Sequence, residues 1–224
     1  MTPPARLPAL LVAALLLPLL GGCVTATVQE VREADTGMES HESVVVLGRR
    51  TLPSNRETEF GFVSCVSKNM RGGGDGIQVI DEQRFRDAMF PWFEPRTAPA
   101  NTSDLPEIIN QPELAARLEE LGLRYLVWIE GDTDRTDAGG SLTCSVTTAG
   151  AGCFGFLTWE NDSSYEASVW DIRTGSSVGR ISSDAVGTSY MPAVVVPLPF
   201  IARVRSSACN SMADQLKRFL TTES

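Results

Sequence analysis

The chain has 224 residues, and 42% of them are hydrophobic. This length and apolar content suit one folded domain, or one domain with a tether. The 28 acidic residues exceed the 19 lysine and arginine residues and give a net charge of −9, which argues against nucleic-acid binding and against electrostatic docking on anionic lipid. The only histidine, His41, precedes the expected fold. We therefore expect no Ser-His-Asp or Cys-His site, no cofactor and no enzymatic activity.

The chain begins with an apolar segment that ends in a cysteine. Arg6 is followed by a 14-residue apolar run over residues 7–20, and the small residues Gly21 and Gly22 precede Cys23. Fourteen helical residues span about 21 Å, which is less than the ~30 Å hydrocarbon core of a bilayer. The order of a positive residue, a short apolar run and small residues is typical of an export signal.

The tetrapeptide Leu20-Gly21-Gly22-Cys23 resembles the lipobox of bacterial lipoprotein precursors. The resemblance implies that residues 1–22 are removed as a signal peptide and that Cys23 then carries lipid, including acyl chains such as palmitate. Val24, rather than Asp, at the next position resembles lipoproteins that are forwarded to the outer membrane. The implied location is the outer membrane facing the periplasm, with the membrane as a partner through Cys23. The alternative is an ordinary secretory signal followed by an unmodified cysteine.

The mature chain is expected to start with a tether and to continue as a single globular domain. Residues 23–43 are polar and mixed in charge, which favours a tether, although Val24, Ala26 and Val28 alternate with polar residues as in an edge strand. Residues 44–47 form a continuous apolar run, which is typical of a strand that is covered on both faces. We therefore place the globular domain at residues 44–224.

The first half of this domain alternates helices and strands. Ser54 and Glu57 have the spacing of a capping box, which predicts a helix directly after them. Pro112 and Gly122 bracket a later helix, because proline favours the first turn and glycine the position after the last. The expected elements are a helix over 55–70, a strand over 77–80, a helix over 82–90, a helix over 112–121 and a strand over 125–129.

The second half is expected to be a β-meander that ends in an amphipathic helix. The helix is predicted over residues 204–220, where Cys209, Met212 and Leu216 begin an apolar stripe at helical spacing. Four successive strands are predicted over 141–148, 153–160, 164–173 and 178–188. Together these elements predict an α+β fold with a mixed β-sheet covered by helices, a C-terminal β-meander and a final amphipathic helix.

This order of elements resembles the anticodon-binding-like fold of several envelope proteins. They include the curli-secretion lipoprotein family, the lipoprotein activators of penicillin-binding proteins and the N-terminal domain of TolB. The resemblance covers about residues 44–220 and rests on element order alone. It implies an envelope domain and transfers no binding residue to this chain.

Four cysteines remain after Cys23, and an even number in an exported protein indicates disulfide bonds. Three pairings exist. Cys144 and Cys153 flank a turn-rich segment and are the local choice, which leaves Cys65 with Cys209, each on a predicted helix. A four-thiolate metal site is the rival interpretation, but structural zinc sites usually contain C-x₂₋₄-C pairs, and the sequence has none.

One cluster of carboxylates could bind a cation. Glu130, Asp132, Asp134 and Asp137 precede Gly139-Gly140, and the first three would lie on one side of a strand. Calcium prefers such oxygen ligands, although the spacing does not fit an EF-hand loop. The competing interpretation is a set of solvated charges at the end of a strand.

Two apolar loops are the candidate contact surfaces. Residues 90–95 contain Trp92 and Phe93 between two prolines, and residues 191–201 contain Phe200. Aromatic side chains in such segments often form contact hot spots, whereas the alternative is burial as irregular cover of the core. We therefore expect a non-catalytic binding or accessory subunit in envelope assembly, with an envelope protein as its partner. The alternative is a calcium-dependent enzyme or ligand-binding protein that uses the carboxylates at 130–137.

Overall fold

The computed structural model describes residues 24–49, 58–94, 96–99, 102–148, 150–197 and 199–222. These residues belong to two compact units, which are described separately. Among the described residues, unit 1 consists of residues 24–25, Arg135–Asn161 and Val186–Arg203. Unit 2 consists of Ala26–Asp134, Asp162–Ala185 and residues from Val204 onward. Cys23, the expected lipidation site, lies outside the described residues.

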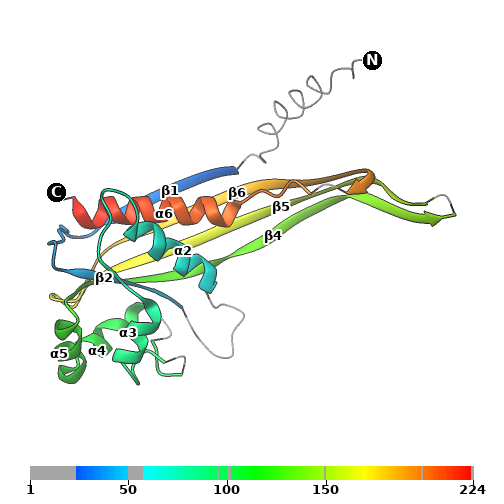
Figure 1. Ribbon diagram of the computed structural model, residues 1–224. Helices are drawn as coiled ribbons and strands as arrows, with labels where there is room; N and C mark the ends of the chain where they lie inside the picture. Colours follow the sequence, from blue (N-terminus) through cyan, green and yellow to red (C-terminus); the bar gives the residue numbers. More distant parts are fainter. Residues whose placement is uncertain are drawn as a thin grey trace, which may run out of the picture. The chain divides into compact units, whose positions relative to one another are not determined.

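The structure is α+β with a mixed sheet and helices, as the sequence predicts (Figure 1). The six strands have the order β1-β6-β5-β4-β2-β3. Their bounds are Val24–Arg32 (β1), Ser43–Gly48 (β2), Val79–Ile80 (β3), Leu123–Thr147 (β4), Gly150–Asp171 (β5) and Ser176–Pro197 (β6). The helices are Phe60–Arg71 (α2), Glu82–Ala88 (α3), the 3₁₀ turn Thr102–Asp104 (η2), Leu105–Ile109 (α4), Pro112–Glu120 (α5) and Val204–Thr221 (α6).

Parallel and antiparallel pairs occur in the same sheet. β2 pairs in parallel with β3 and with β4, so that Val46 lies opposite Val127. β4, β5 and β6 are neighbours in chain order, and their connections are too short for a parallel crossover, so these pairs are antiparallel. β1, in the segment that the sequence left open between a tether and an edge strand, is a strand at one end of the sheet order.

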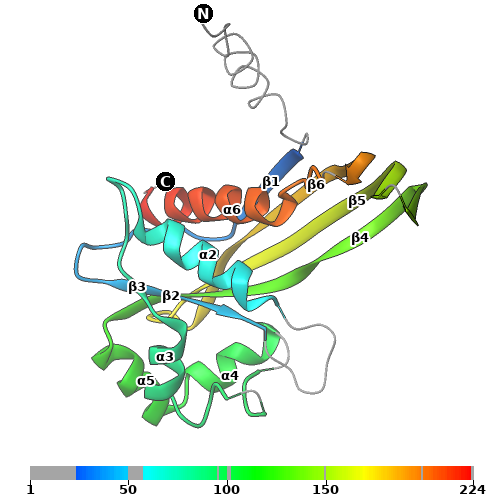
Figure 2. The ribbon, with the colours of Figure 1, turned by 45° about the vertical axis from the view of Figure 1, so that its right-hand side comes forward.

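β2 is buried on both faces in unit 2, as its continuous apolar sequence predicts. All six of its residues are buried. Successive side chains of a strand point to opposite faces, and Val45 and Leu47 belong to the core cluster that packs against α3, α4 and α5. Val44 and Val46 are equally buried and point the other way. Figures 1 and 2 show α2 and α6 over one face of this part of the sheet and α3, α4 and α5 over the other.

A disulfide joins the two helices that share a face. Cys65 of α2 is bonded to Cys209 of α6, and the two helices pack along each other. Cys209, Met212 and Leu216 are fully buried, so the predicted apolar stripe of α6 is the side that faces the core. α2 begins at Phe60 rather than at residue 55, and the expected capping residues Ser54 and Glu57 lie outside the described residues.

The strands of the second half are longer than the sequence predicts. β4 joins the expected strands 125–129 and 141–148, and β5 joins 153–160 and 164–173. The sequence suggests breaks because charged residues and glycines separate the apolar runs. In the structure these glycines lie within the strands: a Cβ on Gly131 would lie 2.1 Å from the Ser164 carbonyl oxygen. Gly131 has a φ of 128°, so it allows a close strand approach that other residues would block.

Tyr165 of β5 lies at the centre of the sheet in unit 2. It is 1% exposed and stacks on Phe62 of α2 with a centroid distance of 3.5 Å. Its hydroxyl forms a 2.9 Å hydrogen bond with the Thr133 hydroxyl. Burial raises the pKa of Tyr165 to about 12, although the hydrogen bond with Thr133 acts in the opposite direction.

This raised pKa predicts a loss of stability at high pH. An unfolded tyrosine loses its proton near pH 10, whereas folded Tyr165 keeps its proton until about pH 12. The stabilisation is complete below pH 10, and the free energy of unfolding then falls by up to about 3 kcal/mol between about pH 10 and pH 12. Urea denaturation across this range should show a shallower decline for Tyr165→Phe. The matched Tyr190→Phe variant, altered at a tyrosine that is 40% exposed, should behave like the wild type, and equal slopes for all three proteins would contradict the prediction.

Candidate functional site

Unit 1 exposes most of the large apolar side chains that the described residues leave at the surface. Ten such side chains are exposed, and seven of them lie in unit 1. By contrast, the buried apolar residues in the described part of unit 1 are only Ala193 and Ala202. Unit 1 therefore contains parts of β4, β5 and β6 with the first two residues of β1, and it has no large buried apolar side chain among its described residues.

Five of the exposed side chains share one face of unit 1. Phe154 and Phe156 alternate with glycine on β5 and therefore point to the same side of the sheet. The rings of Phe156 and Tyr190 have centroids 6.2 Å apart, which places Tyr190 of β6 on this side as well. Val186 and Val196 have the same alternation along β6 as Tyr190. We call these five residues the apolar face.

Other contacts hold the strands of unit 1 together. Cys144 of β4 and Cys153 of β5 form the second disulfide, in the local pairing that the sequence favours. The Asn161 side chain donates a 3.2 Å hydrogen bond to the Ser189 hydroxyl, which also accepts from the backbone N–H of Ala202 at 3.0 Å. Phe200, a predicted contact residue, is half-buried and exchanges two backbone hydrogen bonds with Tyr190.

The other predicted contact segment lies in unit 2. Phe93 is fully buried against Phe85 and belongs to the core, so the prediction of a surface contact at Phe93 is wrong. Trp92 is half-buried and donates a 2.9 Å hydrogen bond from Nε1 to Gln111 Oε1. Phe90 is 61% exposed. The sequence alone did not distinguish Phe90 from Phe93, because a proline-bounded loop has no periodicity that assigns side chains to a face.

Arg117 of α5 holds this segment in place. Its guanidinium lies 5.1 Å from the centroid of the Trp92 ring. Its Nη1 atom donates to the carbonyl oxygens of Ala88 and Phe90, each at 3.2 Å. These two hydrogen bonds hold the backbone at Ala88 and Phe90, while the Phe90 ring remains exposed.

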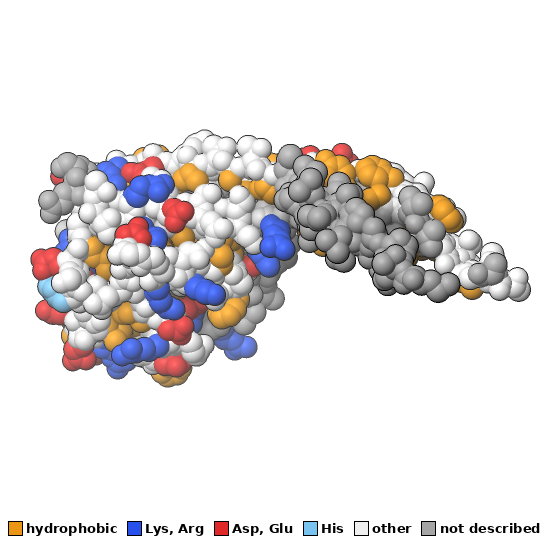
Figure 3. Space-filling model, turned by 45° about the horizontal axis from the view of Figure 1, so that its top comes forward, with side chains coloured by type: hydrophobic (Ala, Val, Ile, Leu, Met, Phe, Trp, Pro, Cys, Tyr) orange, Lys and Arg blue, Asp and Glu red, His pale blue; other side chains and the backbone are white. Residues whose placement is uncertain are grey.

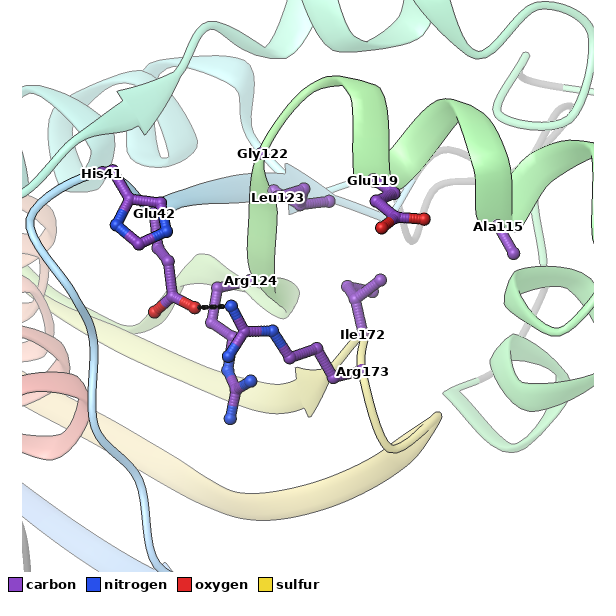
Figure 4. Close-up of a pocket in the computed structure, with 9 residues that line it drawn as sticks. All are labelled: His41, Glu42, Ala115, Glu119, Gly122, Leu123, Arg124, Ile172 and Arg173. Carbon is purple, nitrogen blue, oxygen red and sulfur yellow. Dashed lines mark ion pairs between the residues drawn. The ribbon is translucent and has the colours of Figure 1, made fainter.

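Unit 2 also contains a pocket of about 480 Å³ (Figure 4). Glu42 and Arg173 form an ion pair in its wall, and Figure 4 shows this pair as a dashed line. Arg124 Nη2 lies 2.8 Å from Asp171 Oδ2, and Asp171 Oδ1 accepts the backbone N–H of Arg173 at 2.9 Å. The pocket is lined by His41, Glu42, Ala115, Glu119, Gly122, Leu123, Arg124, Ile172 and Arg173.

The two arginines that line this pocket form ion pairs with carboxylates of the same unit. Burial lowers the pKa of the Arg124 guanidinium, but hydrogen bonding to Tyr125 and the negative charges of Asp171 and Glu42 outweigh that effect and raise it. Arg124 therefore stays cationic and paired. Both arginines thus neutralise neighbouring carboxylates, and the Arg124–Asp171 ion pair joins the start of β4 to the end of β5.

The carboxylates at 130–137 are not gathered into a metal site. Glu130 Oε2 lies 3.3 Å from Arg49 Nη1, and Glu130 Oε1 accepts a 3.2 Å hydrogen bond from Trp128 Nε1. Asp132, Asp134 and Asp137 are exposed. Among the described residues, no group of three or more His, Cys, Asp or Glu side chains could hold a metal ion. Within the same residues, no helix combines the length and the apolar character that crossing a bilayer requires.

We expect calcium to leave the melting temperature of the protein unchanged. A ligand that binds only the folded state raises the midpoint with its concentration, and this arrangement offers calcium no ligand set. Thermal melts with EDTA and with increasing CaCl₂ provide the measurement. A rise that grows with calcium concentration and disappears in the Asp132→Asn/Asp134→Asn variant would contradict the expectation.

No protein-family model matches the chain, and no curated protein matches it. Among solved structures, the chain is similar to two structures of the PelC dodecamer from Paraburkholderia phytofirmans. It is 14% identical to each, with TM-scores of 0.40 and 0.39, and the similarity covers 88% and 89% of this chain and 100% of the PelC chains. At these values the similarity assigns the chain neither to a family nor to an activity.

Proposed function

We propose that the protein is a lipid-anchored envelope protein that acts as a non-catalytic accessory subunit and binds a protein partner through Phe90 and Trp92. The lipobox-like residues that end at Cys23 support the anchor, and the two disulfides fit an oxidising compartment such as the periplasm. The single envelope domain over 44–224 and the β-meander remain parts of this proposal, whereas β1 occupies Val24–Arg32 of the expected tether over 23–43.

The main support for a partner-binding site is that Phe90 is exposed on a backbone that Arg117 holds in place. An aromatic side chain that is 61% exposed presents apolar area to a partner, and Arg117 already orders the segment around it. Ordering a contact loop before binding lowers the entropy cost of association. Aromatic anchors of this kind are enriched among the residues that dominate interface energies.

The test combines capture of the partner with analysis of the amino terminus. The acylated protein is cross-linked in the envelope, and partner recovery is compared for the wild type, Phe90→Ala and the control Phe60→Ala, which alters a residue that is 63% exposed elsewhere in unit 2. We expect Phe90→Ala to lower recovery about tenfold or more and Phe60→Ala to leave it unchanged. Recovery as an unpartnered monomer, or an unmodified thiol at Cys23 in mass spectrometry, would contradict the proposal.

A further inference from the structure

Unit 1 is almost free of charge. No Asp, Glu, Lys, Arg or His occurs in the 22 residues 138–159 or in the 17 residues 186–202. Charged residues make up 21% of the whole chain, so an average composition would place about eight of them in these two segments. In Figure 3, blue and red side chains crowd the surface of unit 2, whereas the visible part of unit 1 shows mainly orange and white atoms.

The apolar face adds aromatic area to this uncharged surface. Phe154 is 57% exposed, Phe156 45% and Tyr190 40%. Val186 and Val196 extend the same face along β6. Exposed apolar patches of this kind mark sites of contact with proteins or membranes, and tyrosine combines an apolar ring with a polar tip that suits the level of lipid headgroups.

The position of Cys23 in the chain favours a membrane as the surface that the apolar face contacts. Val24 and Thr25 belong to unit 1, and Cys23 directly precedes them in the chain. Consecutive Cα atoms lie about 3.8 Å apart, so a lipid on Cys23 would bring unit 1 to the bilayer surface with no intervening linker. This step rests on the proposed lipid anchor.

The missing charges also indicate which lipid surface fits. Moving a charged side chain out of water is costly. Residues 138–159 and 186–202 contain no charged side chain, so their approach to the lipid headgroups would desolvate no charge. Basic residues that would attract anionic lipid are absent from these segments, and the whole chain is acidic. We propose that the apolar face of unit 1 docks on the bilayer to which the chain is anchored, and that it binds electrically neutral lipid through its aromatic rings.

The experiment removes the covalent lipid so that only the apolar face is measured. The mature chain with Cys23→Ser is exported behind a non-lipoprotein signal peptide, so that both disulfides form. Flotation with phosphatidylcholine vesicles then measures its partition. We expect binding that persists as the salt concentration rises, since ion screening acts only on charge interactions. Vesicles enriched in phosphatidylglycerol should bind no better.

Two matched double variants locate the binding surface. Phe154→Ser/Phe156→Ser should lower the partition coefficient about tenfold per phenylalanine, and thus about 100-fold together. Val31→Ser/Phe60→Ser removes two exposed apolar side chains from unit 2 and should bind like the parent. The melting temperatures of both variants provide the folding control. A tryptophan placed by Phe156→Trp should be quenched by brominated phosphatidylcholine, whereas one placed by Phe60→Trp should not.

Three outcomes would overturn this inference. The first is no detectable flotation of the Cys23→Ser chain with the vesicles, and the second is equal binding by both double variants. The third is that Phe154→Ser/Phe156→Ser converts an oligomer to a monomer in sedimentation without lipid. The last result would assign the apolar face to a second copy of the chain. In each case the proposed function stands if the acylated protein still captures its partner in a Phe90-dependent way, so the two proposals fail separately.

Discussion

Replacing both Cys65 and Cys209 with serine should lower the free energy of unfolding by up to about 5 kcal/mol. The two cysteines are 144 positions apart in sequence, so the disulfide removes a large amount of chain entropy from the unfolded state. The bond also connects α2 to α6, the two helices that share one face of the sheet in unit 2. Urea denaturation followed by tryptophan fluorescence measures the change.

The second disulfide provides the matched control. Cys144 and Cys153 are nine positions apart, and the same entropy argument gives about 2.5 kcal/mol for Cys144→Ser/Cys153→Ser. We therefore expect the long-range pair to contribute about twice as much as the local pair. Equal losses for both double variants, or no loss for Cys65→Ser/Cys209→Ser, would show that chain entropy does not govern these bonds.

Phe93→Ala should destabilise the protein by about 4 kcal/mol, in the range typical of a buried phenylalanine truncated to alanine. Phe93 has no exposed area and packs edge-to-face on Phe85, with ring centroids 5.0 Å apart. Removing its ring leaves a cavity between α3 and the segment that follows it. Chemical denaturation of the purified variant gives the loss directly.

Phe90→Ala is the control, because the two residues are three positions apart in the same segment. Phe90 is 61% exposed, and its truncation should change stability by about 0.5 kcal/mol or less. The two variants thus separate stability from binding, since Phe93→Ala acts on the core and Phe90→Ala on the proposed partner contact. A similar loss of stability in both variants would contradict the assignment of Phe93 to the core and Phe90 to the surface.

The parts of the fold that the sequence predicts well are those in which local pattern and burial agree. The apolar run at 44–47 indicates a strand covered on both faces, and β2 is buried throughout. The stripe that begins at Cys209 indicates which side of α6 faces the core. In both cases one periodicity determines the element and its buried side.

The strand lengths depend on tertiary contacts that the pattern does not contain. Polar residues and glycines between 130 and 141 resemble a loop, but β4 continues through them because β5 pairs alongside. Phe90 and Phe93 illustrate the same limit at the candidate site, since only packing against Phe85 determines which ring is buried. The absence of charge over 138–159 was visible in the sequence, but its meaning required the exposure of Phe154 and Phe156.

The position of α6 over one face of the sheet also constrains the order of events during folding. Its side chains complete the layer that shields one side of the central strands, and its residues are the last described part of the chain. A polypeptide that has been made only as far as β6 therefore has α2 but lacks the α6 part of this layer. α2 packs on β2 and follows it closely in the chain, whereas α6 begins some 160 residues after Val44, so the area that α6 covers stays open until residues 204–221 have been made.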